Sequence, residues 1–314
     1  MILAAPLASA QSPAASGAPV RIIIGFPPGG ALDQLARVLA EQLRGASGDT
    51  VLVENRPGAS TRIAIEAVKQ ASPDGKTILI ASTAPFVIFP MTYKRLAYDV
   101  DKDFTPVAHL VNVPTMVSAG VNQPYQTLPQ YLAWVRSHPK ENGVGVTSLG
   151  GILHFAILQL GKNIGVPLNV VAYKGGSQLA TDIIGGHVRI GTDALSSQLE
   201  LHRAGRLRIL GVSGHRRISS LPDVPTLKEA GVDAFDHANA SYGAYLPAGT
   251  PRDVVDTLER LLIATVNKPQ VQAQLARLGL EPTGLPGTEL KKMLQAERGF
   301  WRPIVESSGF TNED

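Results

Sequence analysis

The sequence predicts an α/β fold with a mostly parallel sheet in each of two lobes. Strand-like apolar patterns alternate with helical patterns along nearly all of the 314 residues, which is typical of parallel sheets covered by helices on both faces. The length suits about two domains. Two extended segments, near 118–125 and 236–247, are placed to carry the chain between two lobes and to act as hinges.

These crossings predict one discontinuous lobe and one continuous lobe. We expect lobe 1 to be built from residues 19–120 and 240–314, and lobe 2 from residues 121–239. The chain is 44% hydrophobic and 18% charged, which suits a globular protein with a sizeable core. It contains no cysteine, so structural disulfides and thiolate metal sites are excluded. The net charge of +3 is scattered, and no basic run is interleaved with aromatics, so we expect no nucleic-acid partner.

The N-terminal residues 1–18 carry a pattern typical of export. Met1 to Gln11 form an apolar run that ends in Ala8-Ser9-Ala10, the small-residue pattern of a signal-peptidase site. The basic start of a signal peptide is missing, since no Lys or Arg precedes Arg21. An alanine-rich disordered terminus is the alternative. We interpret residues 1–18 as a signal-peptide remnant truncated at its N-terminus, followed by a disordered lead-in, and we expect a periplasmic protein.

Hydrophobic periodicity predicts the elements in order. Proline inside the apolar stretch Val107–Val121 favours an extended crossover there rather than a helix. The segment Ser219–Gly231 is rich in Pro, Asp and Ser and is expected to hold at most a short helix. Strands are predicted at Val20–Ile24, Val51–Glu54, Thr77–Ser82, Val144–Thr147, Leu168–Tyr173, Val188–Thr192, Leu207–Ser213 and Ser241–Leu246. Helices are predicted at Leu35–Leu43, Ala64–Ala71, Leu128–Ser137, Asp253–Leu278 and Glu289–Val305.

The first strand, turn and helix suggest an anion site. The strand Val20–Ile24 breaks at Pro27-Pro28-Gly29-Gly30, and apolar residues then resume at helical spacing from Leu35. Free N–H groups and the dipole at a helix N-terminus favour negative charge, and glycine lets a ligand approach the backbone. The alternative is an ordinary glycine-containing corner of an α/β protein.

Several blocks of the sequence together resemble a known family. Phe-Pro-Pro-Gly-Gly-x-x-Asp at 26–33 resembles the opening of the Bug family, the TctC-like periplasmic solute-binding proteins of tripartite tricarboxylate transporters. The resemblance covers nearly the whole chain. Two pairs depart from it: the family usually has glycine where Thr61 and Arg62 stand, and proline where Ala172 and Gln178 stand. Further blocks in matching order are 53–59, 72–77, 221–226, 229–231, 242–243 and 247–251.

The resemblance implies a fold, a ligand class and a partner. The fold is that of a two-lobed, type II (Venus-flytrap) periplasmic binding protein. The ligand is a small organic carboxylate, gripped between loop 26–33 and loop 173–177 with the help of ordered waters. The partners are the membrane permease subunits of a tripartite tricarboxylate transporter, or a sensor kinase. We expect the receptor to be a monomer.

Five loops at the ends of predicted strands carry glycines or hydroxyl groups at helix starts. Ligands of open α/β sheets bind at the carboxyl ends of the strands. The alternative for each loop taken alone is an ordinary helix N-cap. Asp33 is expected in the first turn of its helix, with a contact to ligand as the alternative. The predicted ligand-binding residues are Phe26, Pro28, Gly29, Gly30, Asp33, Ser82, Thr83, Thr147, Ser148, Gly150, Gly151, Tyr173, Gly175, Gly176, Ser177 and Asp193.

Common enzyme and cofactor motifs fail in this sequence. Asp74-Gly75-Lys76-Thr77 ends like a phosphate-binding loop, but Gln70 stands where its first glycine is required. Neither a dinucleotide-binding Gly-x-Gly-x-x-Gly nor a Gly-x-Ser-x-Gly elbow occurs. We therefore expect no cofactor, no metal and no catalytic residue. Contacts of Lys174 and His154 with a ligand are left open, and solvent exposure and helix packing are their ordinary roles.

These patterns predict a receptor that closes on a carboxylate by a hinge motion and performs no chemistry. The alternatives are an α/β enzyme of acyl or phosphoryl transfer that uses the same cleft, and a receptor that serves signalling. An enzyme would need a nucleophile paired with a base, and no motif supplies that pair.

Overall fold

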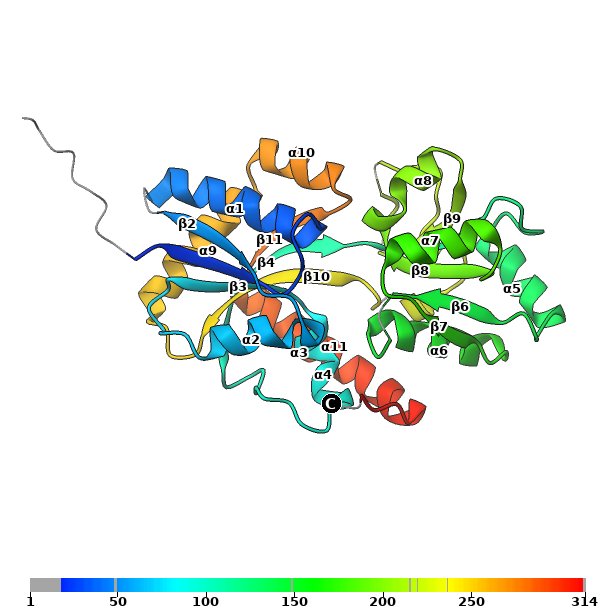
Figure 1. The fold of residues 1–314 in the computed structure, drawn as a ribbon, viewed down its shortest axis with the longest axis horizontal. Coiled ribbons are helices and arrows are strands. Elements are labelled where there is room, and N and C mark those ends of the chain that lie inside the picture. Colours follow the sequence, from blue (N-terminus) through cyan, green and yellow to red (C-terminus); the bar gives the residue numbers. More distant parts are fainter. Residues whose placement is uncertain are drawn as a thin grey trace, which may run out of the picture.

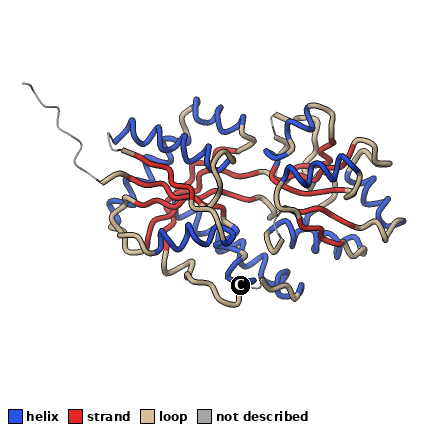
Figure 2. The backbone as a smooth tube through the Cα atoms, in the orientation of Figure 1, coloured by secondary structure: helices blue, strands red, loops and turns tan. Residues whose placement is uncertain are grey.

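The computed structural model shows two α/β lobes side by side, joined by strands that pass between them (Figure 1). It describes residues 18–47, 50–147, 149–214, 216–218, 220–235 and 237–312. Strands of both sheets run along the long axis of the molecule, with helices on either side (Figure 2). The predicted two-lobed α/β fold is confirmed. The predicted signal-peptide remnant lies outside the described residues.

Lobe 1 is a six-stranded sheet in the order β11-β4-β10-β3-β1-β2. Apolar strand residues such as Ile22 and Ile24 are buried against α1 and α9. Its strands are β1 (Val20–Ile24), β2 (Val51–Asn55), β3 (Thr77–Ser82), β4 (Phe104–Val113), β10 (Ala240–Pro247) and β11 (Glu281–Pro286). Its helices are α1 (Ala31–Ser47), the 3₁₀ turn η1 (Ala59–Thr61), α2 (Arg62–Lys69), α3 (Ala84–Val87), α4 (Phe89–Thr92), α9 (Arg252–Val266), α10 (Pro269–Arg277) and α11 (Gly287–Ser308).

Lobe 2 is a five-stranded sheet in the order β7-β6-β8-β5-β9. Helix α5 buries Leu128, Leu132 and Val135, as its periodicity predicts, and begins at a capping box formed by Thr127 and Gln130. The strands are β5 (Thr115–Gly120), β6 (Gly143–Val146), β7 (Asn169–Ala172), β8 (Ile190–Ala194) and β9 (Leu207–Val212). The helices are α5 (Leu128–Ser137), α6 (Ile152–Ile164), α7 (Gly176–Gly185), η2 (Leu195–Ser197), α8 (Leu199–Arg203) and η3 (Asp233–Phe235).

Both sheets are mixed, so the expectation of mostly parallel sheets is wrong. In lobe 1, β1 pairs parallel with β2 and β3, whereas β10 is antiparallel to both of its neighbours. In lobe 2, β6 is parallel to β7 and β8, whereas β5 is antiparallel to β8 and β9. The reason is connectivity: β5 and β10 enter their sheets from the other lobe and therefore run against the strands that end at the interlobe edge.

The first chain crossing lies earlier than the sequence predicts. Strand β5 is hydrogen-bonded within the lobe 2 sheet over its full length, so the crossing falls at Pro114 and not in 118–125, and lobe 1 ends before residue 120. Proline interrupts the long apolar stretch where the chain leaves one sheet for the next. The return crossing ends where β10 begins at Ala240, inside the predicted segment 236–247.

One side chain ties the two crossings together. Ser213, which follows β9, accepts a hydrogen bond from the Thr115 amide at 2.7 Å, and its own amide donates to the Thr115 carbonyl at 2.8 Å. The Ser213 hydroxyl also donates to the Asn239 side chain beside the return crossing. Within the described part of the chain, no helix has both the length and the apolar character required to cross a membrane.

Candidate functional site

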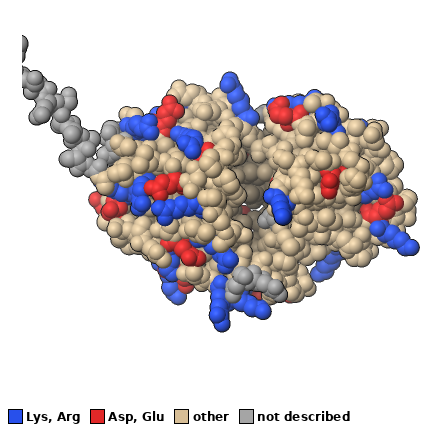
Figure 3. Space-filling model, in the orientation of Figure 1, with Lys and Arg blue, Asp and Glu red and all other residues tan. Residues whose placement is uncertain are grey.

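The candidate site lies in the hollow between the lobes, which the space-filling view shows near the centre of the molecule (Figure 3). Strands β1 and β3 of lobe 1 and β6 and β8 of lobe 2 end at this gap (Figure 1). Burial raises the pKa of Tyr242 to about 12, and the negative charge of Asp193 from the other lobe adds to this rise. Asp193 is the next-to-last residue of β8 in lobe 2, and Tyr242 belongs to β10 of lobe 1.

In lobe 1, a buried carboxylate shapes the glycine loop between β1 and α1. Asp33, in the first turn of α1, accepts a hydrogen bond from the Gly29 amide at 2.9 Å. Arg37 donates to its two oxygens at 2.9 and 3.0 Å, and Asn55 donates to it at 2.9 Å. Asn55 also donates to the Phe26 carbonyl at 3.0 Å. The carboxylate thus accepts four hydrogen bonds, and these hold the glycine loop in shape.

These contacts leave the loop rigid and its backbone open. The hydrogen bond from Arg37 is the largest of the effects that lower the pKa of Asp33 to about 2, so the carboxylate is ionised at neutral pH. Residues 26–30 are exposed, and neither Gly29 nor Gly30 has a neighbour within 4 Å of its Cβ position. Gly29 has φ +92°, a conformation that favours glycine. The backbone is therefore accessible at Gly29 and Gly30, next to the start of α1, where the first amides of a helix have no partner within the helix.

A left-handed segment borders this loop. Ala59, Ser60 and Thr61 all have positive φ, of 45°, 52° and 75°, which is rare for residues with a side chain. Position 61, where the resemblance implies glycine, has a backbone that favours glycine, whereas Arg62 is right-handed with φ −58°. A Cβ on Gly25 would lie 2.5 Å from Thr61, so strand β1 approaches this segment closely. Sequence reasoning missed Thr61 as a site residue, although its departure from the family glycine was a signal.

Two buried threonine hydroxyls in lobe 1 have no hydrogen-bond partner among the described residues. The Oγ1 atoms of Thr61 and Thr83 are both buried. Ser82 ends β3, pairs with Tyr242 across the sheet and is half-buried, and the Thr83 amide donates to the Ser241 carbonyl at 3.0 Å. A buried hydroxyl without a partner is costly, so these positions suit polar atoms of a bound molecule or water.

In lobe 2, Asp193 organises two predicted loops. Its Oδ1 accepts a hydrogen bond from the Thr147 hydroxyl at 2.6 Å. A Cβ at Gly176 would lie 2.5 Å from its Oδ2 and 2.7 Å from the Ser197 Cβ, so only glycine fits at the start of α7. Gly175 has nothing within 4 Å of its Cβ position, and Ser177 is exposed. Asp193 thereby brings loop 147–151 and loop 173–177 together.

The loop before α6 is supported from behind. Gly150 has φ +71°, and its amide donates to Nδ1 of His154 at 3.0 Å. Gly151 is the N-cap of α6. His154 is 6% exposed, and burial lowers its pKa, which keeps the ring neutral and Nδ1 free to accept. This is the packing role that a lone histidine ordinarily has, and Ser148 lies outside the described residues.

Tyr173 lies in the predicted loop, but its hydroxyl is used within lobe 2. It donates to the Asp182 carboxylate of α7 at 2.9 Å, and the ring lies beside Gly145 of β6. Burial and the hydrogen bond with Asp182 raise the pKa of Tyr173 to about 12. Lys174 is exposed. Sequence reasoning also missed Tyr242 and Asn55, although both lie in blocks that carry the family resemblance.

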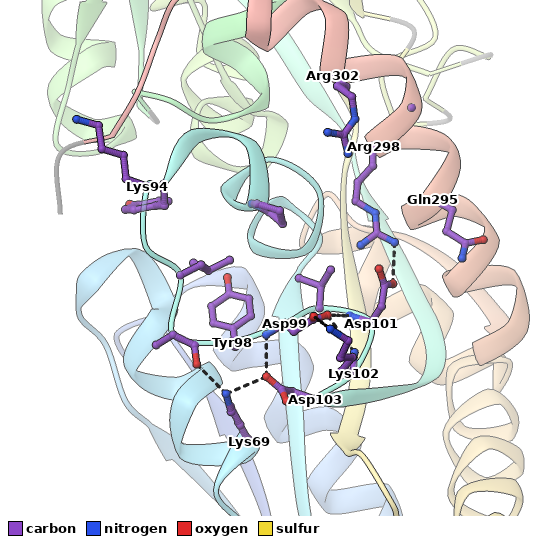
Figure 4. Close-up of a pocket in the computed structure, with 16 residues that line it drawn as sticks. Lys69, Lys94, Tyr98, Asp99, Asp101, Lys102, Asp103, Gln295, Arg298 and Arg302 are labelled. Carbon is purple, nitrogen blue, oxygen red and sulfur yellow. Dashed lines mark hydrogen bonds and ion pairs between the residues drawn. The ribbon is translucent and has the colours of Figure 1, made fainter.

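A second groove lies on lobe 1, between segment 90–103 and α11 (Figure 4). It has a volume of about 960 Å³ but contains none of the predicted residues. Its three aspartates are each paired with a cation, and Lys94 and Arg302 also line it. The pairs are Lys69–Asp103 at 2.9 Å, Lys102–Asp99 at 3.0 Å and Arg298–Asp101 at 2.8 Å. Within the described ranges, no group of three acidic or histidine side chains is arranged to hold a metal ion.

Known proteins are similar to this chain in both sequence and fold. Residues 35–310 match the model of the tripartite tricarboxylate transporter family receptor. The protein BugT of Bordetella pertussis is 28% identical over 308 residues, which cover 98% of this chain and 93% of BugT. R. palustris Rpa4515 with adipate is similar with a TM-score of 0.83 at 28% identity, covering 93% of this chain and 98% of that one. MatC (Rpa3494) from Rhodopseudomonas palustris with bound malate has a TM-score of 0.77 at 27% identity, covering 91% of this chain and 98% of MatC.

The family model thus spans most of the chain, and the solved relatives have the same two-lobed fold. The chain belongs to the tripartite tricarboxylate transporter receptor family, the Bug or TctC-like solute-binding proteins.

Proposed function

We propose that this protein is a periplasmic receptor that captures a small organic carboxylate between its lobes and delivers it to the membrane permease of a tripartite tricarboxylate transporter. The protein binds its ligand and returns it chemically unchanged. Loop 26–30 of lobe 1 holds the carboxylate through backbone amides, and loops 147–151 and 175–177 of lobe 2 close over it.

The observation that carries this proposal is the open glycine loop at the start of α1. Its internal anion, Asp33, is already compensated by Arg37 and Asn55, so it does not consume the remaining amides of the helix start. Fixed N–H groups hold an anion by charge-assisted hydrogen bonds without a full counter-charge. The buried hydroxyls of Thr61 and Thr83 supply further donors or acceptors beside the loop.

Closure follows from a ligand that touches both lobes. The lobes are connected by the crossings at Pro114 and before Ala240, and Ser213 bonds to both. A ligand stabilises the closed form only through contacts that the open form lacks. A carboxylate bound to loop 26–30 alone would not close the protein, so the lobe 2 loops are required for the response.

Calorimetric titration with matched acids and esters tests the ligand class. Adipate and malate are suitable probes because related structures hold them, and succinate and citrate extend the series. At least one acid should bind and raise the Tm. At an acid concentration of about a hundred times its Kd, binding should increase the free energy of unfolding by about 2.7 kcal/mol. Its methyl ester should bind more weakly, because helix N-termini favour full negative charge.

The same samples decide between a receptor and an enzyme. NMR of the mixture after incubation should show the acid unchanged. Consumption of the acid would make the protein an enzyme. Equal affinity for the acid and its ester would refute the proposed anion site. A complete lack of binding across the series would refute the proposed ligand class.

A further inference from the structure

The last described residues of the chain connect the lobes at a place apart from the two strand crossings. Helix α11 packs on β4 and α3 of lobe 1 and on α6 of lobe 2 (Figure 1). It ends at Ser308, and Gly309, with φ +66°, turns the chain. The Phe310 amide donates to the Ser308 hydroxyl at 3.1 Å, which fixes the turn. We call residues 309–312 the C-terminal strap.

On the lobe 2 side, the strap packs against the candidate ligand loop. The Phe310 ring stands edge-on to the rings of His154 and Phe155, at centroid distances of 4.9 and 5.8 Å. A Cβ at Gly150 would lie 2.6 Å from the Phe310 ring. Because the Gly150 amide donates to His154, the same histidine links the ligand loop to the strap.

On the lobe 1 side, the strap is hydrogen-bonded to α4. The Asn312 amide donates to the Thr92 carbonyl at 2.8 Å, and its side chain donates to the Thr92 hydroxyl at 3.0 Å. Asn312 and Tyr93 also form a parallel β-bridge. Thr92 is buried, so this anchor is part of the lobe 1 structure rather than a loose surface contact.

We propose that the C-terminal strap is a clasp between the lobes, in which Phe310 is a positioning residue for the ligand loop 147–151 and Asn312 is the anchor to lobe 1. Separation of the lobes at the strap must break either the contacts of Phe310 and Asn312 with Gly150 or the bonds of Asn312 with Thr92. The strap therefore favours the arrangement of the lobes seen in this structure, with or without ligand, and its contacts set how readily the lobes separate.

Distance measurement between spin labels on the two lobes tests this proposal. The chain has no cysteine, so Glu41→Cys on α1 and Thr181→Cys on α7, both at exposed positions, give one label in each lobe. In ligand-free protein, Phe310→Ala and Asn312→Ala should each shift the distance distribution to longer values. Hydrogen exchange of the peptide that contains residues 149–155 should become faster in Phe310→Ala.

Trp134→Ala is the matched control, because Trp134 packs on Tyr131 and His138 within lobe 2 alone. It should lower the Tm without changing the interlobe distances. Unchanged distances in Phe310→Ala would overturn the proposal. If Phe310→Ala does not fold, unchanged distances in Asn312→Ala would overturn it instead. An equal shift of the distances in the control Trp134→Ala would also overturn it. The link to ligand rests on the proposed function, but the distances need no ligand, so the two ideas fail separately.

Discussion

The ligand loops of the two lobes are held in shape by different means. In lobe 1, loop 26–30 is fixed from within by Asp33, in the helix that the loop begins, together with Arg37 one turn later. In lobe 2, loop 147–151 has a local bond to His154, but it also depends on residues distant in the sequence: Asp193 on one side and Phe310 on the other. One half of the site is thus formed locally, and the other half depends on the assembled protein.

This difference indicates which loops of the site keep a fixed shape and which loops move with the lobes. A loop that carries its own buried, hydrogen-bonded carboxylate keeps its shape whether the cleft is open or closed. A loop that is supported by a segment from the other end of the chain is sensitive to how the lobes sit. We therefore expect the lobe 1 loop to be a preformed anion site and the lobe 2 loops to respond to closure.

The largest expected effect comes from removing the internal anion of lobe 1. Asp33→Asn should lower the free energy of unfolding by about 3 kcal/mol, because it removes the charge of a buried carboxylate that accepts hydrogen bonds from Gly29, Asn55 and the half-exposed Arg37. The folded pKa of Asp33 is about 2, below the ordinary 3.8, so this stability is present above pH 4 and is lost as the pH falls toward 2. Denaturant unfolding at several pH values measures it.

The control for this variant is Asp74→Asn, since Asp74 is exposed and caps only the nearby Lys76 amide. It should be nearly neutral. If Asp33→Asn keeps wild-type stability at pH 7, or if the difference persists unchanged at pH 2, the internal ion pair does not fix the loop.

A smaller effect is expected from crowding the start of α7 in lobe 2. Gly176→Ala places a methyl group 2.5 Å from the Asp193 carboxylate, and such overpacking costs about 2 kcal/mol. Ligand affinity should fall with stability because Asp193 also holds Thr147. Gly175→Ala is the matched neighbour, with open space and an extended backbone, and it should fold normally. Equal melting temperatures for the two variants would contradict the assigned role of Asp193.

The smallest of these effects on stability concerns the glycine pair of lobe 1. Gly29→Ala puts a side chain at φ +92°, at a cost of about 1 kcal/mol, and should weaken binding because the amides are displaced. Gly30→Ala meets no neighbour and should leave the fold intact. Thermal unfolding and titration of both variants measure the contrast. A stronger destabilisation by Gly30→Ala would show that the backbone of this loop has been misassigned.

The sequence predicts the local half of the site better than the distant half. The strand, turn and helix of residues 20–43 follow from periodicity and from glycine and proline placement, and Asp33 was expected in the first helical turn. The support of Gly150 by Phe310 depends on tertiary contact, and no local pattern indicates it. Hydrophobic periodicity likewise does not indicate the direction of a strand in its sheet. For this reason the mixed sheets were not predicted.

Single residues explain other differences. Strand β11 contains Pro282 and Pro286 and was not predicted, since proline disfavours strands; it is tolerated here because β11 is at the edge of its sheet. The helix predicted over 253–278 is two helices, α9 and α10, which break before Pro269. Thr61 adopts a backbone that favours glycine, which only the fold around Gly25 explains.

Small-angle X-ray scattering tests the central claim most directly, by measuring the radius of gyration with and without the acid that raises the Tm. A receptor that closes on a carboxylate held by both lobes should become more compact at saturating acid, and its methyl ester at equal concentration should produce a smaller change. An unchanged radius of gyration in protein shown by calorimetry to be saturated would contradict the account.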